Sequence, residues 1–178
     1  IKRDVQAKGL AHLEVVFASL PRRLGKDPVG PGIGLVGSAL LDQRVLRHCD
    51  LGAACLLEPL PVPELNRTLE RLYTQGDAEE RRMILKALSL LEIGPATHAL
   101  LETAHRTNDM VLFEAAFADQ DLAARALADD MYFRVVLKSA FNDIDHERLL
   151  GIEQRARPEL SSMLLECMSE REAAGRPV

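Results

Sequence analysis

The amino-acid sequence predicts an all-α fold in which antiparallel helical hairpins stack as a right-handed, HEAT-like α-α superhelix. Leu and Ala dominate the composition, with Glu and Arg beside them, and all four are good helix formers. Apolar residues recur at helical spacing along most of the chain, and Gly, Pro and capping residues separate these stripes. Expected helix starts two helices apart differ by about 30 to 37 residues, which approaches the period of helical-hairpin repeats.

The chain has 178 residues, of which 47% are hydrophobic, and a formal net charge of −5. This length suits one domain, so we expect residues 1–178 to form a single helical-repeat domain. The acidic balance opposes nucleic-acid binding, which usually requires a basic footprint. No run of about 18 apolar residues is present, so no membrane insertion is expected. The three cysteines form no CxxC pair and fit buried, reduced thiols in a cytoplasmic protein.

The N-terminal third of the chain is predicted to contain three helices and a flexible loop. Apolar residues at helical spacing favour a helix over residues 2–20, which Pro21 should end. A loop rich in Gly and Pro follows near residues 25–37. Two shorter helices are expected over residues 37–49 and 51–57.

From Pro63 onwards the expected helix boundaries become regular. Pro63 suits the first position of a helix that Gly76 should end. Asp77 and Glu80 have the spacing of a capping box at the start of the next helix. The remaining helices are expected to begin near Pro95, Asn108, Asp119, Asp129 or Asp130, Asp145 and Pro158.

One segment matches a cofactor-binding pattern, because residues 32–37 read G-x-G-x-x-G. A dinucleotide site requires a strand directly before these glycines and a βαβ unit around them. The preceding segment contains Pro28 and Pro31 and cannot form a central strand. We therefore interpret the glycines as an interhelical loop and expect no cofactor.

His98, Glu102 and His105 are the candidate metal ligands, because spacings of four and three place them on one helical face. Imidazole and carboxylate groups suit zinc or iron. The row points away from the apolar stripe of the same helix, so the main interpretation is a solvated face and no metal site is expected.

The acidic cluster at 143–147 is interpreted as helix N-terminal charge. The basic pair Arg81-Arg82 is interpreted as part of a solvated face.

The turn at residues 104–109 is the most distinctive polar segment of the sequence. Asn108 or Thr107 could cap the following helix, and Arg106 could bind a carboxylate or the last carbonyl groups of the preceding helix. A second interpretation is a ligand-binding site, in which polar residues of this turn and of a later helix converge. The candidate ligand-binding residues are Arg106, Asn108, Asp109, Arg134 and Lys138.

Five short phrases, in the same order, resemble EboA-domain proteins. The phrases are LPRRLG at 20–25, LYTQGDAEE at 72–80, RTND at 106–109, FRVVLK at 133–138 and EREAAGRP at 170–177. The resemblance covers most of the chain from Leu20 on, with little match between about residues 27 and 60. It implies a small helical protein whose gene neighbours encode a membrane-bound type of prenyltransferase, a dehydroquinate-synthase-like enzyme and TIM-barrel proteins. The pathway it implies makes a metabolite precursor or moves it towards the periplasm, and the family supplies no catalytic residues.

We therefore expect a non-catalytic helical scaffold or adaptor, which binds a pathway protein or a small metabolite in its concave face. No nucleophile elbow or other catalytic motif is recognised in the sequence, which favours this role over an enzyme. The alternative is an enzyme that acts on a prenylated or aromatic intermediate, with Arg106, Asp109, Arg134 and Lys138 converging in an enclosed apolar pocket. A nucleic-acid-binding helical repeat is the weaker alternative and would require a basic concave stripe.

Overall fold

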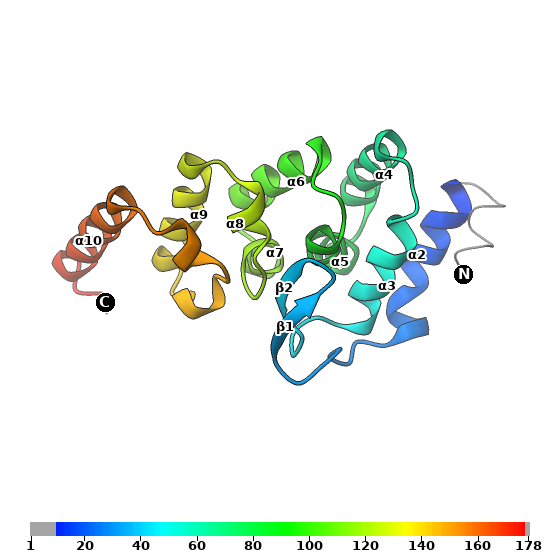
Figure 1. Ribbon diagram of the computed structural model, residues 1–178, viewed down its shortest axis with the longest axis horizontal. Helices are drawn as coiled ribbons and strands as arrows, with labels where there is room; N and C mark the ends of the chain where they lie inside the picture. The colour runs from blue at the N-terminus through cyan, green and yellow to red at the C-terminus, as the bar shows by residue number, and fades with distance from the viewer. Residues whose placement is uncertain (1–9, 177–178) are drawn as a thin grey trace.

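The computed structural model describes residues 10–176, and most of these residues are helical (Figure 1). The helices follow one another along the long axis of the molecule, with α2 at one end and α10 at the other. Nine α-helices lie within the described residues. They are α2 (Leu10–Leu24), α3 (His48–Leu57), α4 (Val62–Gln75), α5 (Ala78–Ala87), α6 (Pro95–Arg106), α7 (Met110–Phe117), α8 (Leu122–Ala126), α9 (Asp129–Phe141) and α10 (Pro158–Ala173).

Four of the helix starts predicted from proline and capping residues are confirmed, those of α4, α5, α6 and α10. Pro63 lies in the first turn of α4, and α6 and α10 begin at Pro95 and Pro158. At the start of α5, the carboxylate of Asp77 accepts a hydrogen bond from the Glu80 amide at 2.8 Å. The Glu80 carboxylate accepts one from the Asp77 amide at the same distance, which completes the capping box.

Several predicted boundaries are wrong. Pro21 lies inside α2, which continues to Leu24, because a proline near a helix end removes one backbone donor and need not stop the last turn. Part of the helix predicted over residues 2–20 lies outside the described residues. The segment predicted as a helix from Asp119 contains only the short α8, since Asp119 itself has a left-handed backbone with φ of 64°. The helix expected at Asp145 consists of two 3₁₀ turns, His146–Arg148 and Ile152–Arg155.

A β-hairpin contradicts the all-α prediction and the predicted helix at 37–49. Strands β1 (Ile33–Val36) and β2 (Ala39–Asp42) pair antiparallel, with Val36 opposite Ala39 beside the turn. The connection is the two-residue turn Gly37-Ser38, and Gly37 has a φ of +63°, which a tight hairpin turn requires. The hairpin therefore occupies part of the predicted Gly/Pro-rich loop and of the predicted helix.

The hairpin is joined to the helices by backbone hydrogen bonds. Leu41 forms an antiparallel β-bridge with Gln120 in the segment between α7 and α8. The amide of Asp42 donates to the carbonyl oxygen of Asp119 at 2.9 Å, and the amide of Asp121 donates to that of Leu40 at 3.1 Å. This segment thus continues the hydrogen bonding of β2 over a short distance.

The main hydrophobic core runs from α2 to α10 and is built by helices that pack on their neighbours. Helix α5 lies at its centre, in contact with α3, α4 and α7. Leu88, Leu101 and Leu112, which belong to apolar stripes of helical spacing, are buried, whereas Leu137 is only partly buried. The largest fully buried side chains include Phe17, Met83, Ile84, Leu85, Phe113 and Phe117.

Charged residues also lie in the interior, which the sequence patterns did not predict. Arg82 is 6% exposed and pairs with the fully buried Asp50, so it is not part of a solvated face. Lys86 is equally buried, and its ammonium donates to the carbonyl oxygen of Ala118 at 2.9 Å. Burial lowers the pKa of Lys86 from about 10.5 to about 8 and raises the pKa of the Asp50 carboxyl above its usual value.

Two of the three cysteines are more accessible than predicted. Cys49 is buried, Cys55 is exposed and Cys167 is half-buried, and none of them forms a disulfide.

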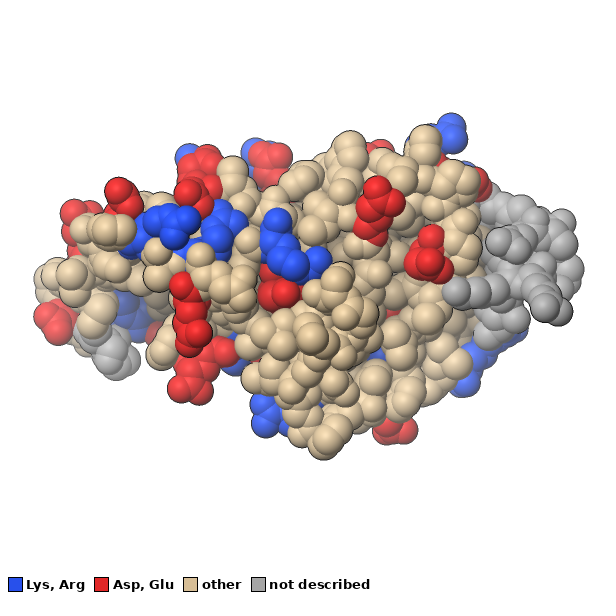
Figure 2. Space-filling model, viewed as in Figure 1, with Lys and Arg blue, Asp and Glu red and all other residues tan. Residues whose placement is uncertain are grey.

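Charged side chains gather mainly over the C-terminal helices on the face seen in Figure 2, and the region of the hairpin is largely uncharged. Within residues 10–176, no helix is long and apolar enough to cross a lipid bilayer.

Candidate functional site

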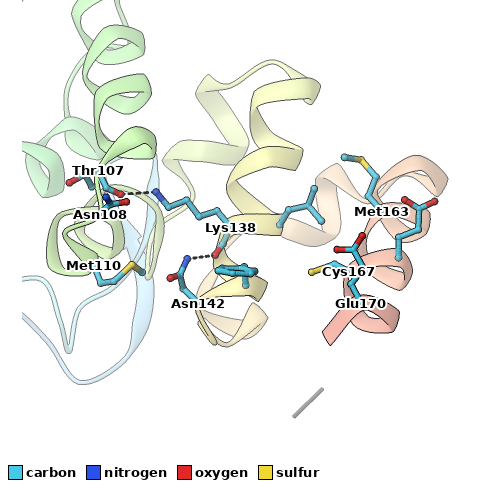
Figure 3. A pocket seen from close by; sticks show the side chains of 11 residues that line it. Thr107, Asn108, Met110, Lys138, Asn142, Met163, Cys167 and Glu170 are labelled. Atoms are coloured by element: carbon cyan, nitrogen blue, oxygen red, sulfur yellow. Dashed lines mark hydrogen bonds between the residues drawn. The ribbon is translucent and has the colours of Figure 1, made fainter. Parts of the chain in front are cut away.

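The candidate site is a groove between α9, α10 and the turn that joins α6 to α7 (Figure 3). We call it the α9–α10 groove, and its volume is about 710 Å³. This volume lies within the range of about 300–1,000 Å³ that is typical of small-molecule sites. Its apolar lining consists of Met110, Leu137, Phe141, Met163 and Cys167. Its polar lining consists of Thr107, Asn108, Lys138, Asn142, Glu166 and Glu170.

Helix α10 has buried residues only near its two ends, and in its middle the partly buried Leu164 packs against the core. Near its start, Leu160 is buried in the core. Near its end, the guanidinium of Arg171 donates to the carbonyl oxygens of Ala140 and Phe141, both at 3.1 Å, and to the Asp143 carboxylate at 2.5 Å. No other residue of α10 is buried, so the middle of the helix leaves space beside α9.

Lys138 forms the end of the groove next to the α6–α7 turn. Its ammonium donates to the carbonyl oxygens of His105 at 2.5 Å and of Thr107 at 2.7 Å. It also lies 4.9 Å from the centroid of the Phe113 ring, within the range of a cation–π interaction. A cation at a helix C-terminus is favoured by the helix dipole, so Lys138 both fixes the turn and brings a positive charge to the groove.

Thr107, two asparagines and two glutamates supply the remaining polarity of the groove. The side-chain amide of Asn142 donates to the carbonyl oxygen of Lys138 at 2.7 Å, at the end of α9. Glu166 and Glu170 are exposed, lie one turn apart on α10 and belong to the wall opposite Lys138. Among residues 10–176, neither carboxylate has an ion-pair partner. The groove is therefore basic at one wall, acidic at the other and apolar between them.

The structure brings two of the five predicted ligand-binding residues into this groove, namely Asn108 and Lys138. Arg106 instead forms an ion pair with Glu102 on the surface of α6. Arg134 is exposed on α9 and does not line the groove.

Asp109 has the helix-capping role that the sequence predicted for Asn108 or Thr107. Its carboxylate accepts hydrogen bonds from the amides of Val111 at 2.9 Å and Leu112 at 3.3 Å. Asp109, and not Asn108 or Thr107, is therefore the N-cap of α7.

The candidate metal ligands do not form a metal site in the described part of the chain. Residues 10–176 contain no group of three His, Cys, Asp or Glu side chains placed to hold a metal ion. Glu102 is engaged with Arg106. Burial lowers the pKa of His105 below its usual value, and the positive charge of Lys138 adds to this effect.

The apolar residues of the groove were not predicted as a site. Phe141, Met163 and Cys167 belong to apolar stripes of helical spacing, and such stripes usually face the core of a protein. Phe141 is 56% exposed, because its stripe faces the gap beside α10. No local pattern distinguishes a stripe that meets the core from one that borders a groove.

The fold and the groove together define a small, mostly helical protein with a ligand-sized cleft near its C-terminal end. Residues 57–178 match the model of a family described as "Metabolite traffic protein EboA". This match covers more than half of the chain, which therefore belongs to the EboA family, as its sequence phrases suggested. The matched residues include α4 to α10 and the whole α9–α10 groove, whereas α2, the hairpin and most of α3 lie outside them. No curated protein and no solved structure matches the chain.

Proposed function

We propose that this chain is a non-catalytic binding protein of a metabolite biosynthesis or precursor-export pathway, and that it holds an amphiphilic metabolite in the α9–α10 groove. The observation that carries this proposal is the composition of the groove, which joins an apolar centre to polar walls in a volume of about 710 Å³. Small-molecule sites combine a mostly apolar lining with a few placed polar groups in this way. The family description of metabolite traffic agrees with such a role.

The lining indicates how a ligand would be held. Phe141 and Leu137 on α9 and Met163 on α10 would contact an apolar body, and the flexible thioether of Met163 suits ligands of irregular shape. Polar groups of the ligand would meet Asn108 at one wall and Glu166 at the other. Lys138 already donates two of its three N–H groups to carbonyl oxygens, so one donor is left for a ligand.

We also propose that the helices of the family-matched region form HEAT-like pairs in a right-handed superhelix, with the groove at the end of the array. The support for this arrangement is that consecutive helices are packed neighbours, as in α4 with α5 and α6 with α7. A concave face of such an array would be continuous with the groove.

A second candidate is a scaffold or adaptor role in which a pathway protein covers α10. Its support is the set of exposed apolar side chains on this helix, Met163, Leu165 and Met168, together with Phe141 of α9. The enzyme alternative has less support, because Arg106 and Asp109 are engaged in contacts away from the groove.

The test is a binding titration of the full chain with the apolar fluorophore N-phenyl-1-naphthylamine. Met163→Glu places a charge in the groove and should weaken binding by about tenfold or more, because burying an unpaired carboxylate is costly. Leu165→Glu is the matched control, since Leu165 lies on the same helix, is 63% exposed and does not line the groove. Equal affinities of the two variants, or no binding by the wild type, would contradict the ligand-binding role.

A parallel measurement identifies natural ligands. Small molecules extracted from the purified full chain with organic solvent are compared by mass spectrometry between the wild type, Met163→Glu and Leu165→Glu. A compound present with the wild type and Leu165→Glu but absent from Met163→Glu supports the groove as its site. If no compound is retained and Leu165→Glu abolishes capture of a pathway enzyme, the adaptor role is favoured instead.

A further inference from the structure

A second apolar cavity is lined by residues of α2 and α3. These two helices lie at the end of the molecule opposite α10 (Figure 1). We call it the α2–α3 cavity, and its volume is about 350 Å³. Four leucines form most of its lining, Leu20 and Leu24 from α2 with Leu51 and Leu56 from α3. The cavity lies outside the residues that match the family model and is independent of the function proposed above.

A glycine in the middle of α3 shapes this cavity. Gly is unfavourable inside a helix, so Gly52 needs a structural reason. A Cβ atom at this position would lie 2.2 Å from Cδ1 of Leu24 and 3.6 Å from Cδ2 of Leu20. The absence of a side chain therefore lets both leucines of α2 approach the backbone of α3. Leu24 nevertheless remains 40% exposed, so the cavity presents apolar surface to solvent that a ligand would bury.

His48 is the residue of the cavity lining that can form a directed side-chain hydrogen bond. Its Nδ1 lies 3.0 Å from the carbonyl oxygen of Asp27, which also accepts the backbone amide of His48 at 3.1 Å. A carbonyl oxygen only accepts hydrogen bonds, so Nδ1 of His48 carries the proton. In the neutral ring, Nε2 is then an acceptor, and within residues 10–176 it has no hydrogen-bond partner. The ring is held in place by the chain and offers one acceptor.

The lining excludes charged ligands. Apart from His48, the cavity contains no ionisable side chain except the thiol of Cys55. An ion placed among four leucines would lose its hydration without gaining a counter-ion. The ligand that complements this lining is neutral and mostly apolar, and it carries a hydrogen-bond donor.

A smaller depression of about 230 Å³ continues the apolar surface on the hairpin side of α3. It shares Leu51 and Cys55 with the α2–α3 cavity and reaches Val36 and Ser38 of the hairpin. Because Cys55 is exposed and lies between the two depressions, its thiol reports on the occupancy of either one.

From these observations we propose that the α2–α3 cavity binds a neutral, largely apolar alcohol. Its hydrocarbon part contacts the leucines of α2 and α3, and its hydroxyl group donates a hydrogen bond to Nε2 of His48. A longer hydrocarbon chain extends past Cys55 towards the hairpin.

The test compares three probes of one chain length, 1-octanol, 1-methoxyoctane and octanoate, by isothermal titration calorimetry with the full chain. The alcohol should bind about threefold to tenfold more tightly than the ether, because the ether cannot donate the hydrogen bond to His48. Octanoate should bind most weakly. The variant His48→Phe keeps an aromatic ring and removes the acceptor, so it should abolish the preference for the alcohol over the ether. His146→Phe is the matched control, since His146 is an exposed residue near the other end of the chain.

A second readout tests whether the probe binds beside Cys55 of α3. In a Cys167→Ser background, 1-octanol should slow the reaction of Cys55 with Ellman's reagent in a saturable manner, and Cys55→Ser supplies the background rate. The proposal is overturned if 1-octanol gives no binding heat, or if it gives a binding heat without protecting Cys55. It is also overturned if the three probes bind equally or if the alcohol preference survives in His48→Phe. Since Met163→Glu does not alter this cavity, failure here is separable from failure of the α9–α10 groove.

Discussion

The ammonium of Lys138 lies 2.7 Å from the carbonyl oxygen of Thr107, although 31 residues separate them in the sequence. This contact ties α9 to the C-terminal end of α6 and shapes one wall of the α9–α10 groove. A charged donor to two helix-terminal carbonyl groups is a stabilising arrangement in its own right.

Replacing Lys138 by Met should therefore destabilise the protein. The two carbonyl groups lose a charged donor, and we expect the free energy of unfolding to fall by about 2–3 kcal/mol. Arg134→Met is the control, because Arg134 is an exposed cation on the same helix, and its effect should stay within about 0.5 kcal/mol. Urea denaturation followed by circular dichroism measures both. Equal effects of the two substitutions would show that the contact does not stabilise the turn.

Lys86 should make the stability of the protein depend on alkaline pH. Its pKa is lowered to about 8 in the folded protein by burial, whereas in the unfolded chain the pKa is about 10.5. Between these values the unfolded chain binds the proton that the folded protein releases, so stability rises with pH. Relative to Lys86→Met, the wild type should gain up to about 3 kcal/mol from pH 8 to pH 10.5. A difference between the two proteins that does not change with pH would contradict a charged, buried Lys86 at neutral pH.

Asp50 and Arg82 should behave as a coupled pair. Asp50→Asn leaves the buried Arg82 with only the Glu79 carboxylate, 3.5 Å from its Nε, and Arg82→Met leaves the Asp50 carboxylate buried without its guanidinium partner. We expect each substitution to cost about 3–5 kcal/mol. The free energy of unfolding of the double variant should fall by about 1–3 kcal/mol less than the sum of the two single decreases. The control cycle uses Glu14 and Arg71, a more exposed ion pair, whose coupling should stay below about 1 kcal/mol. Similar coupling energies in both cycles would mean that burial does not strengthen the interaction between Asp50 and Arg82.

The caps of α5 and α7 can be tested with alanine substitutions. Asp77→Ala and Asp109→Ala each remove a side chain that accepts helix N-terminal amides, and each should cost about 1 kcal/mol. Asn108→Ala should cost less than about 0.5 kcal/mol, because Asn108 does not cap α7. A larger loss for Asn108→Ala than for Asp109→Ala in thermal unfolding would reverse the assignment of the cap.

The sequence was informative where local chemistry determines the structure. The Asp77–Glu80 capping box and the prolines at 63, 95 and 158 act within one helical turn, so their effects can be read from neighbouring residues. The hairpin was missed because its strands depend on distant partners. Leu41 bridges to Gln120, and such tertiary contacts override local preference.

The candidate site was predicted only in part, because local chemistry identifies some of its residues but not the space between them. The polar turn near residue 107 and Lys138 were singled out by their composition, and Lys138 and Asn108 do meet in one groove. Arg106 binds a carboxylate, as its position in the turn suggested, and Asp109, rather than the predicted Asn108 or Thr107, caps α7. The space between α9 and α10 arises from how Leu160 and Arg171 anchor a helix whose middle is not buried, and no pattern in the sequence encodes that gap.

The backbone hydrogen bonds between β2 and the segment after α7 affect how the sequence of the protein can change in evolution. They connect the part of the chain outside the family match to the matched part, and they use only main-chain atoms of Leu40, Asp42, Asp119 and Asp121. Substitutions at outward-facing positions of the hairpin, such as the 70% exposed Leu35, leave these backbone hydrogen bonds unchanged. The N-terminal portion can therefore acquire new surface chemistry while its attachment to the remainder of the molecule is preserved.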